Sequence, residues 1–214
     1  MNKSIALQNY VIHQLDTFFP TVEGKTKLNV KSFNIGLHAV SNSISKVLAY
    51  RGTEFDYLNS GQYATFLYYL SHYVWMNDSD KVTATRIFLL NKALHGIDLF
   101  YEVKMPKYFL VGHSSGIVFT KARYGEYCVF HQGCTVGRNF EDRPIIGNFT
   151  IMYPNSSVIG KCKIGDNTII TPGVQIINRN IPGNCIVFPG SDGDLKLKKI
   201  ENEIKFRFLP ISRL

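Results

Sequence analysis

Two histidines and an upstream carboxylate are the residues in this sequence whose spacing first suggests acid–base chemistry. His113 and His131 lie 18 residues apart, and Asp98 lies 15 residues before His113. A neutral imidazole can remove a proton from a hydroxyl or an amine, so His113 is a candidate general base. A carboxylate that accepts the ring N–H orients the imidazole and stabilises its protonated form, and Asp98 is the candidate for that role.

The chain around these residues repeats with a period of six. From residue 118 onward a large apolar residue recurs, and a small or short residue precedes most of these positions by two. A period of six suits neither a helix nor a simple strand, but it fits a parallel β-helix with three strand-and-turn units per coil. Coils of 18 residues would place His113 and His131 on one edge, one rung apart. The recurring positions are Val118, Tyr124, Phe130, Val136, Ile146, Met152, Val158, Ile164, Ile170 and Ile176.

One interval in the repeat is too long. Val136 and Ile146 are ten residues apart, so four extra residues must leave the coil within the segment 138–145. An insertion in a solenoid forms a surface loop and is often part of the binding face. Arg143 lies in this loop and is a candidate contact for an acceptor, whereas a loop without function is the other interpretation.

The remainder of the chain divides into a helical part and a basic tail. Apolar residues at helical spacing predict helices, with Ser79 as an N-cap and Gly96 as a C-terminal stop. Alternating apolar and basic residues in 195–214 predict a strand that packs along the solenoid. The expected helices are 34–50, 58–75 and 79–94, and the expected domains are a helical domain (1–97), a β-helix domain (98–190) and a C-terminal strand or tail (191–214).

Composition limits the classes of protein. Hydrophobic residues make up 45% of the chain and charged residues 19%, which excludes a disordered chain. The net charge of +8 favours an anionic partner. The four cysteines form no CxxC pair, so we expect buried thiols and no metal. Without a signal peptide or a membrane-spanning run we expect a cytoplasmic protein, and we expect no nucleic acid as partner.

Several short segments resemble one known family. The run from His113 to Val118, His-Ser-Ser-Gly-Ile-Val, resembles the D-H-A-T-G-I-V segment of bacterial serine O-acetyltransferases, in the hexapeptide-repeat acyltransferase superfamily. Residues 134–137 resemble the V-T-L-G segment that follows, residues 142–144 resemble D-R-H-P, and residues 59–75 resemble the helix before the family's solenoid. The resemblance covers about residues 57–190.

The resemblance implies a helical domain followed by a left-handed parallel β-helix, and acetyl transfer from acetyl-CoA to a hydroxyl. It implies a trimer, or two trimers paired through their helical domains, with active sites between neighbouring solenoids. His113 would be the base and Asp98 its partner, and Arg143 would contact the acceptor. The candidate positions for CoA are Gly137, Tyr153, Pro154, Thr171 and Pro172.

The sequence also departs from the family. The aspartate before the base is Gly112 here, and the histidine of D-R-H-P is absent, for which His131 is a candidate substitute in acceptor binding. Pro154 and Pro172 stand where the family offers backbone amides, and proline has no N–H. Because no acid at position 112 holds an ammonium group, we predict a sugar hydroxyl of a surface polysaccharide or its precursor as the acceptor. The alternative acceptor is L-serine.

Two further hypotheses belong to other classes of protein. A metal-dependent hydratase like the γ-class carbonic anhydrases needs three histidines at one metal, and the solenoid offers only His113 and His131. A non-catalytic, anion-binding scaffold would explain the basic charge and the two prolines. Binding of acetyl-CoA distinguishes this scaffold from the enzyme.

Overall fold

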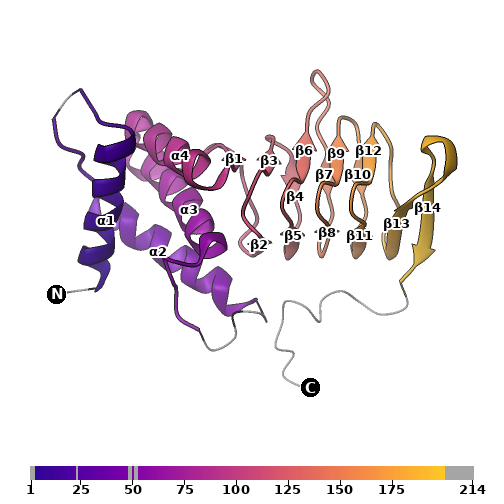
Figure 1. The fold of residues 1–214 in the computed structure, drawn as a ribbon, viewed down its shortest axis with the longest axis horizontal. Coiled ribbons are helices and arrows are strands. Elements are labelled where there is room, and N and C mark those ends of the chain that lie inside the picture. The colour runs from indigo at the N-terminus through magenta and orange to yellow at the C-terminus, as the bar shows by residue number, and fades with distance from the viewer. Residues whose placement is uncertain (1–2, 23, 48–49, 51–52, 201–214) are drawn as a thin grey trace.

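The computed structural model describes residues 3–22, 24–47, 50 and 53–200. Helices pack together at the N-terminal end, and the coils of a parallel β-solenoid follow one another along the long axis of the molecule (Figure 1). The predicted architecture, a helical part followed by a β-helix, is therefore confirmed. None of the helices in the described part of the chain is long and apolar enough to cross a membrane.

The helical part contains one helix more than the sequence predicted. The first helix, α1, lies in a segment for which we predicted no structure. Gly96 ends the last helix at a φ of 64°, as predicted. Ser79 is not an N-cap: it ends the preceding helix in the left-handed region, and the Asp80 side chain caps the next one by accepting from the Thr83 N–H. The helices are α1 (Lys3–Phe18), α2 (Val30–Ser45), α3 (Ser60–Asp78) and α4 (Lys81–His95).

Helix α3 joins the helices to the solenoid. It is buried on nearly every side, between α2, α4 and the first coil. The Tyr68 hydroxyl donates to the Val103 carbonyl at 2.7 Å, and the Tyr69 hydroxyl donates to the Lys107 carbonyl at 3.1 Å. Burial raises the pKa of both phenols, so both stay protonated and act as donors to the first coil.

The solenoid has three parallel sheets, one for each face of the prism. The sheet orders are β1-β3-β6-β9-β12, β4-β7-β10, and β2-β5-β8-β11-β13 with β14 added at the end. The strands are β1 (Asp98–Leu99), β2 (Phe109–Val111), β3 (Val118–Phe119), β4 (Arg123–Tyr124), β5 (Cys128–Phe130), β6 (Thr135–Gly137), β7 (Ile145–Ile146), β8 (Ile151–Met152), β9 (Ser157–Ile159), β10 (Lys163–Ile164), β11 (Thr168–Ile170), β12 (Gln175–Ile177), β13 (Cys185–Pro189) and β14 (Leu195–Lys199).

The six-residue repeat marks the interior of the prism, with one error. The recurring positions from Phe130 onward are at most 2% exposed. Val118, the first member of the predicted series, is instead 41% exposed, and its neighbour Phe119 is buried in register with Val136. The reason is that the step from the inward Phe119 to Tyr124 is five residues, one fewer than the repeat.

The cysteines fill the corners of the prism as buried thiols. All four are free and buried. Cys128 donates to the carbonyl three residues earlier at 3.1 Å, and Thr150 and Thr168 do the same with their hydroxyls at 2.8 and 2.7 Å. A short side chain with one donor therefore closes the turn from inside, which explains the small residues of the repeat.

The predicted insertion leaves the coil as a hairpin. Between β6 and β7, Asn139 and Asp142 pair in antiparallel fashion and exchange two backbone hydrogen bonds of 3.0 Å. Phe140 stands at its tip with 88% of its side chain exposed. Since Thr135 is in register with Ser157, the coil is four residues longer here, as the sequence predicted.

The C-terminal end of the solenoid is covered by an antiparallel strand. Strand β14 pairs with β13 from Leu195 to Lys199, with a short 3-10 turn, Ser191–Gly193, between them. Its three lysines blunt the exposed sheet edge against pairing with another chain. The strand predicted for the tail is confirmed over 195–199, and residues 201–214 lie outside the described part of the chain.

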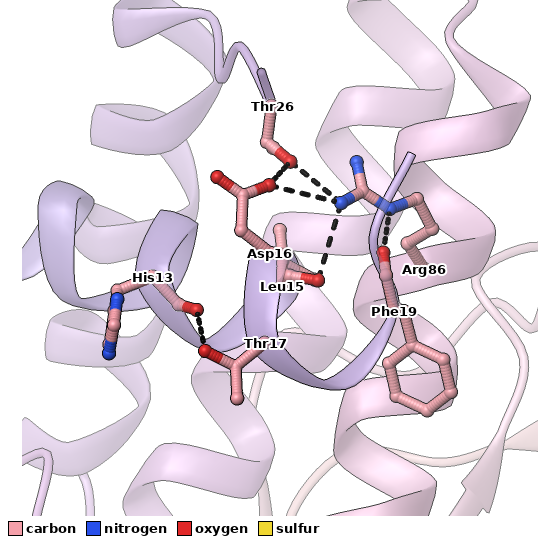
Figure 2. Close-up of polar contacts among 7 residues, drawn as sticks. All are labelled: His13, Leu15, Asp16, Thr17, Phe19, Thr26 and Arg86. Atoms are coloured by element: carbon pink, nitrogen blue, oxygen red, sulfur yellow. Dashed lines mark hydrogen bonds and ion pairs between the residues drawn. The ribbon is translucent and has the colours of Figure 1, made fainter. Parts of the chain in front are cut away.

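A buried arginine connects α1, α4 and the loop after α1 (Figure 2). Arg86 is 8% exposed and donates to the carbonyls of Phe19 and Leu15 at 2.6 and 3.3 Å. The same guanidinium contacts the Thr26 hydroxyl at 2.6 Å and the Asp16 carboxylate at 3.4 Å, and Thr26 also donates to Asp16. The Leu15 carbonyl also accepts from the Phe19 N–H at 2.9 Å, so Arg86 joins the end of α1 to the loop after it.

This cluster predicts an acid-sensitive step in stability. The Thr26 hydroxyl, together with Arg86, lowers the pKa of Asp16 below 3.8. Because the folded pKa lies below the unfolded one, the carboxylate contributes stability above about pH 4, and this contribution is lost as the pH falls below it. We expect Asp16→Asn to flatten the decrease in unfolding free energy between about pH 5 and pH 2.5, measured by urea titration at each pH. The exposed-loop variant Glu141→Gln should follow the wild type, and an Asp16→Asn curve parallel to the wild type would contradict the assignment.

Candidate active site

The corner that carries His113 is longer than the corners stacked on it. It spans residues 112–117 between β2 and β3, whereas the corner above it spans only 131–134. The registers on either side differ accordingly: Val111 pairs with Phe130, and Val118 pairs with Thr135. His113 has a φ of 50°, in the left-handed region that Tyr127, Phe149 and other corner residues of the solenoid also occupy. The extended corner, and not this conformation, distinguishes His113 from the corners stacked on it.

The rings of the two predicted histidines lie side by side. The ring centroids of His113 and His131 are 6.1 Å apart, with an angle of 32° between the planes. The His131 ring is stacked in parallel on Tyr153, at 5.1 Å and 5°. Three rings from three successive coils therefore form a ladder along one edge of the solenoid.

The same edge brings together most of the other predicted site residues. The backbone N–H of His131 donates to Met152, that of Tyr153 to Ile170 and that of Thr171 to Val187, at 3.0 to 3.1 Å. These bonds place Gly112, His131, Tyr153 and Thr171 one above another. The next column holds the two prolines, since Gly173 donates to Pro154 at 3.0 Å.

The His131 ring leaves no space for a side chain at position 112. A Cβ built on Gly112 would lie 2.9 Å from Nδ1 and 3.1 Å from Cε1 of His131. Gly112 is not among the described residues with a positive φ, so its backbone does not require glycine. The His131 ring occupies the volume that a side chain at position 112 would fill.

Asp98 lies elsewhere than the 15-residue spacing suggested. It is in register with Val118, and its backbone N–H donates to Ile117 at 2.8 Å. Its carboxylate forms an ion pair with Lys92 at 2.7 Å. Among the hydrogen bonds of the described residues none joins Asp98 to His113, so its role as partner of the base stays a prediction.

Arg143 and Gly137 lie at the other end of the strands. The histidine corners precede β3 and β6, whereas Gly137 ends β6 and the hairpin with Arg143 follows it. Arg143 is exposed on this hairpin. Within one chain, the structure therefore does not bring Arg143 to His113.

Two polar atoms that the sequence did not single out are buried beside the histidines. The Ser114 hydroxyl and Oε1 of Gln132 have no hydrogen-bond partner. Ser114 is 7% exposed and directly follows His113, and Gln132 directly follows His131. Buried polar atoms in folded proteins are nearly always satisfied, so these two are candidate ligand contacts.

The thiols near this edge are poor nucleophiles. Burial raises the pKa of Cys134, which lies in the same corner as His131. Burial also raises the pKa of Cys128 to about 12. A thiolate is the nucleophilic form of cysteine, so neither side chain suits a covalent acyl intermediate at neutral pH. The described residues hold no group of three or more His, Cys, Asp or Glu arranged for a metal.

A hollow of about 460 Å³ lies at the C-terminal end of the solenoid. It is lined by Gly173, by β12 and the turn after it, and by the β13–β14 hairpin, including Gln175, Arg179 and Leu195. Arg179 forms an ion pair with Asp194 at 2.8 Å. A larger hollow of about 910 Å³ lies between α1, α2 and residues 53–57, apart from the histidines.

Comparisons with known proteins establish the fold. No family model and no curated protein matches this chain. Solved structures do match. The serine acetyltransferase of Brucella abortus has a TM-score of 0.69 and 14% identity over 92% of this chain and 85% of its own. That of Neisseria gonorrhoeae in complex with serine has a TM-score of 0.66 and 18% identity over 92% and 84%. A serine acetyltransferase in complex with CoA has a TM-score of 0.60 and 16% identity over 91% and 76%.

This chain therefore has the fold of the serine acetyltransferases, with helices followed by a β-solenoid, as the sequence resemblance implied.

Proposed function

We propose that the protein transfers an acetyl group from acetyl-CoA to a hydroxyl, with His113 as the general base. The observation that carries this proposal is the extended corner that holds His113 with its ring beside His131, on an edge shared with Tyr153 and Thr171. The similarity to serine acetyltransferases, one of them in complex with CoA, supports it.

In this mechanism His113 accepts the proton of the acceptor hydroxyl. The acceptor oxygen attacks the thioester carbonyl, the carbon–sulfur bond breaks, and the leaving thiolate recovers the proton. A direct transfer fits the raised thiol pKa values, because no activated cysteine lies in the corner. We assign Asp98 to orienting the imidazole.

The donor would be held by side chains more than by backbone amides. The N–H groups of Tyr153, Asn155, Thr171 and Gly173 all donate to the neighbouring coil. The Thr171 hydroxyl also donates to Val187 at 2.8 Å. We therefore assign the thioester arm to contact with the faces of Tyr153, Pro154 and Pro172, and the nucleotide end to the hollow that Arg179 lines.

The acceptor that the comparisons favour is L-serine. Matched structures carry serine or cysteine in their complexes, and a sugar of a polysaccharide gains no support from them. L-serine is therefore the first acceptor to test, and nucleotide sugars and oligosaccharides come after it.

Acetyl transfer is tested by incubating the protein with acetyl-CoA and each acceptor, and by following released thiol and the mass of the product. We expect an acceptor-dependent release and a product heavier by one acetyl group. The same protein should be protected against heat by acetyl-CoA through binding to the folded state. If there is neither transfer nor protection, the non-catalytic scaffold is the better description.

A shared site between copies follows from the separation of Arg143 and His113. We propose a trimer in which Arg143 of one copy reaches His113 of another. Co-expression of His113→Ala with Arg143→Ala should then recover about a quarter of the wild-type rate, since one site in four receives both side chains by random mixing. The measurement is acetyl transfer by the co-purified variants. Mixing His113→Ala with Arg138→Ala, a neighbouring arginine, controls for dilution, and no recovery with Arg143→Ala would contradict the shared site.

A further inference from the structure

The residue directly before the proposed base has no side chain because a ring from the next coil fills the space. The Cβ of any larger residue at position 112 would lie 2.9 Å from Nδ1 of His131, closer than real Cβ atoms approach. Parallel stacking on Tyr153 holds the His131 ring in this place. The polar group beside His113 at this corner is therefore an imidazole of fixed orientation.

The corners stacked on this one hold histidines but no formally charged residue. The four corners are residues 112–117, 131–134, 153–156 and 171–174, and they contain no Asp, Glu, Lys or Arg. The Asp98 carboxylate on the first coil pairs with Lys92 and is assigned above to the His113 ring, so we do not assign it to the acceptor. An ammonium group on an acceptor would thus find no counter-charge in these corners. A carboxylate, in contrast, can accept a hydrogen bond from an imidazole N–H.

We propose that His131 determines acceptor specificity and selects hydroxyl compounds that carry a carboxylate, whether or not they carry an ammonium group. The proposal rests on the acetyl transfer proposed above, and it identifies the carboxylate as the group of the acceptor that the site binds. L-serine belongs to this class through its carboxylate. A hydroxy acid such as glycerate belongs to it equally, and ethanolamine, which keeps the ammonium but lacks the carboxylate, does not.

The first experiment measures binding, so that it does not depend on turnover. Glycerate, L-serine and ethanolamine are titrated into the protein by calorimetry. We expect glycerate and L-serine to bind with similar affinity, and ethanolamine to bind at least about tenfold more weakly. His131→Ala should lower the affinity for glycerate and for L-serine by about tenfold and leave the affinity for ethanolamine unchanged. His38→Ala, at an exposed histidine of α2, should bind like the wild type.

A second variant tests the geometry. Gly112→Ala displaces the His131 ring, so it should lower the affinity for glycerate to the value of the His131→Ala variant. Added to His131→Ala, the same change should have no further effect, because the ring is already gone. A melting curve for each variant shows that the fold is kept.

The outcomes separate this proposal from the proposed function. Three outcomes would each overturn the role of His131. They are ethanolamine binding as tightly as glycerate, an affinity for glycerate that does not change in His131→Ala, and additive effects of the two substitutions on that affinity. Carboxylate binding that depends on His131 without acetyl transfer to any acceptor would overturn the proposed function and leave the specificity site standing.

Discussion

Replacing His113 by alanine should lower the rate of acetyl transfer by at least about a hundredfold, the usual contribution of a positioned general base. His113 is the residue that the long corner holds at a φ of 50°, with its ring beside that of His131. Without the His113 imidazole the acceptor hydroxyl keeps its proton at neutral pH, because the remaining residues of 112–117 carry no base and the His131 ring lies one coil away, at 6.1 Å. The measurement is kcat and KM with acetyl-CoA and the best acceptor.

The control for this prediction is a histidine outside the solenoid. His38→Ala, at an exposed position of α2, should keep the wild-type rate. Both variants should melt like the wild type and elute with the same oligomeric mass. A His113→Ala enzyme that turns over within about threefold of the wild type would remove the base from the mechanism.

The solenoid was predictable because each coil contacts only its neighbouring coils. Each inward side chain, such as Phe130 or Ile170, packs against the next coil, so the same pattern of apolar residues recurs in every coil. The insertion before β7 was visible as an interval that was too long. The small residues two positions before the inward ones, which include Cys128, Cys134 and Cys162, follow the same period.

The exact stacking was less predictable, because the period is an average. A two-residue extension of the first corner places Asp98 beside Val118, and a five-residue step from Phe119 to Tyr124 leaves Val118 outward, although a fixed period of 18 predicted neither. His113 lies in the extended corner. The residue that departs from the repeat is thus the residue proposed for chemistry, which is where local rules are expected to fail.

The helical part was predicted only in outline. Helix α3 is buried on nearly all sides, so no single apolar stripe marks its inner face. Helix α1 buries only two of its residues, Val11 and Leu15, which is a weak pattern. The Asp16, Thr26 and Arg86 contacts join segments up to 70 residues apart, and no spacing in the sequence indicates them.

In the candidate site the sequence placed His113 and His131 on one edge, as the structure shows, but could not orient their rings. The stacking of His131 on Tyr153, and the exclusion of a side chain at position 112, depend on ring orientation. Ser114 and Gln132 carried only one signal, their positions directly after the two histidines. Whether Arg143 belongs to the site depends on a second copy of the chain, which one sequence does not describe.

Arg86→Ala should lower the free energy of unfolding by about 3 kcal/mol, because hydrogen bonds to a buried charged group are among the strongest in proteins. The variant removes the donor to the Phe19 carbonyl and the second donor to the Leu15 carbonyl, and it leaves a gap under the loop that carries Thr26. Arg86→Lys should recover only part of the loss, since one ammonium cannot reproduce the planar fork of the guanidinium. Equilibrium unfolding in urea measures each value.

Lys81→Ala, at an exposed lysine of the same helix, should stay within about 0.5 kcal/mol of the wild type. The Arg86 cluster lies among the helices, far along the chain from the histidine edge, so kcat of the folded Arg86→Ala protein should be unchanged below its melting transition. The expected pattern is therefore the reverse of that for His113→Ala, which loses rate and keeps stability. An Arg86→Ala protein that unfolds like the wild type would show that α1 is held to α4 by its apolar contacts alone.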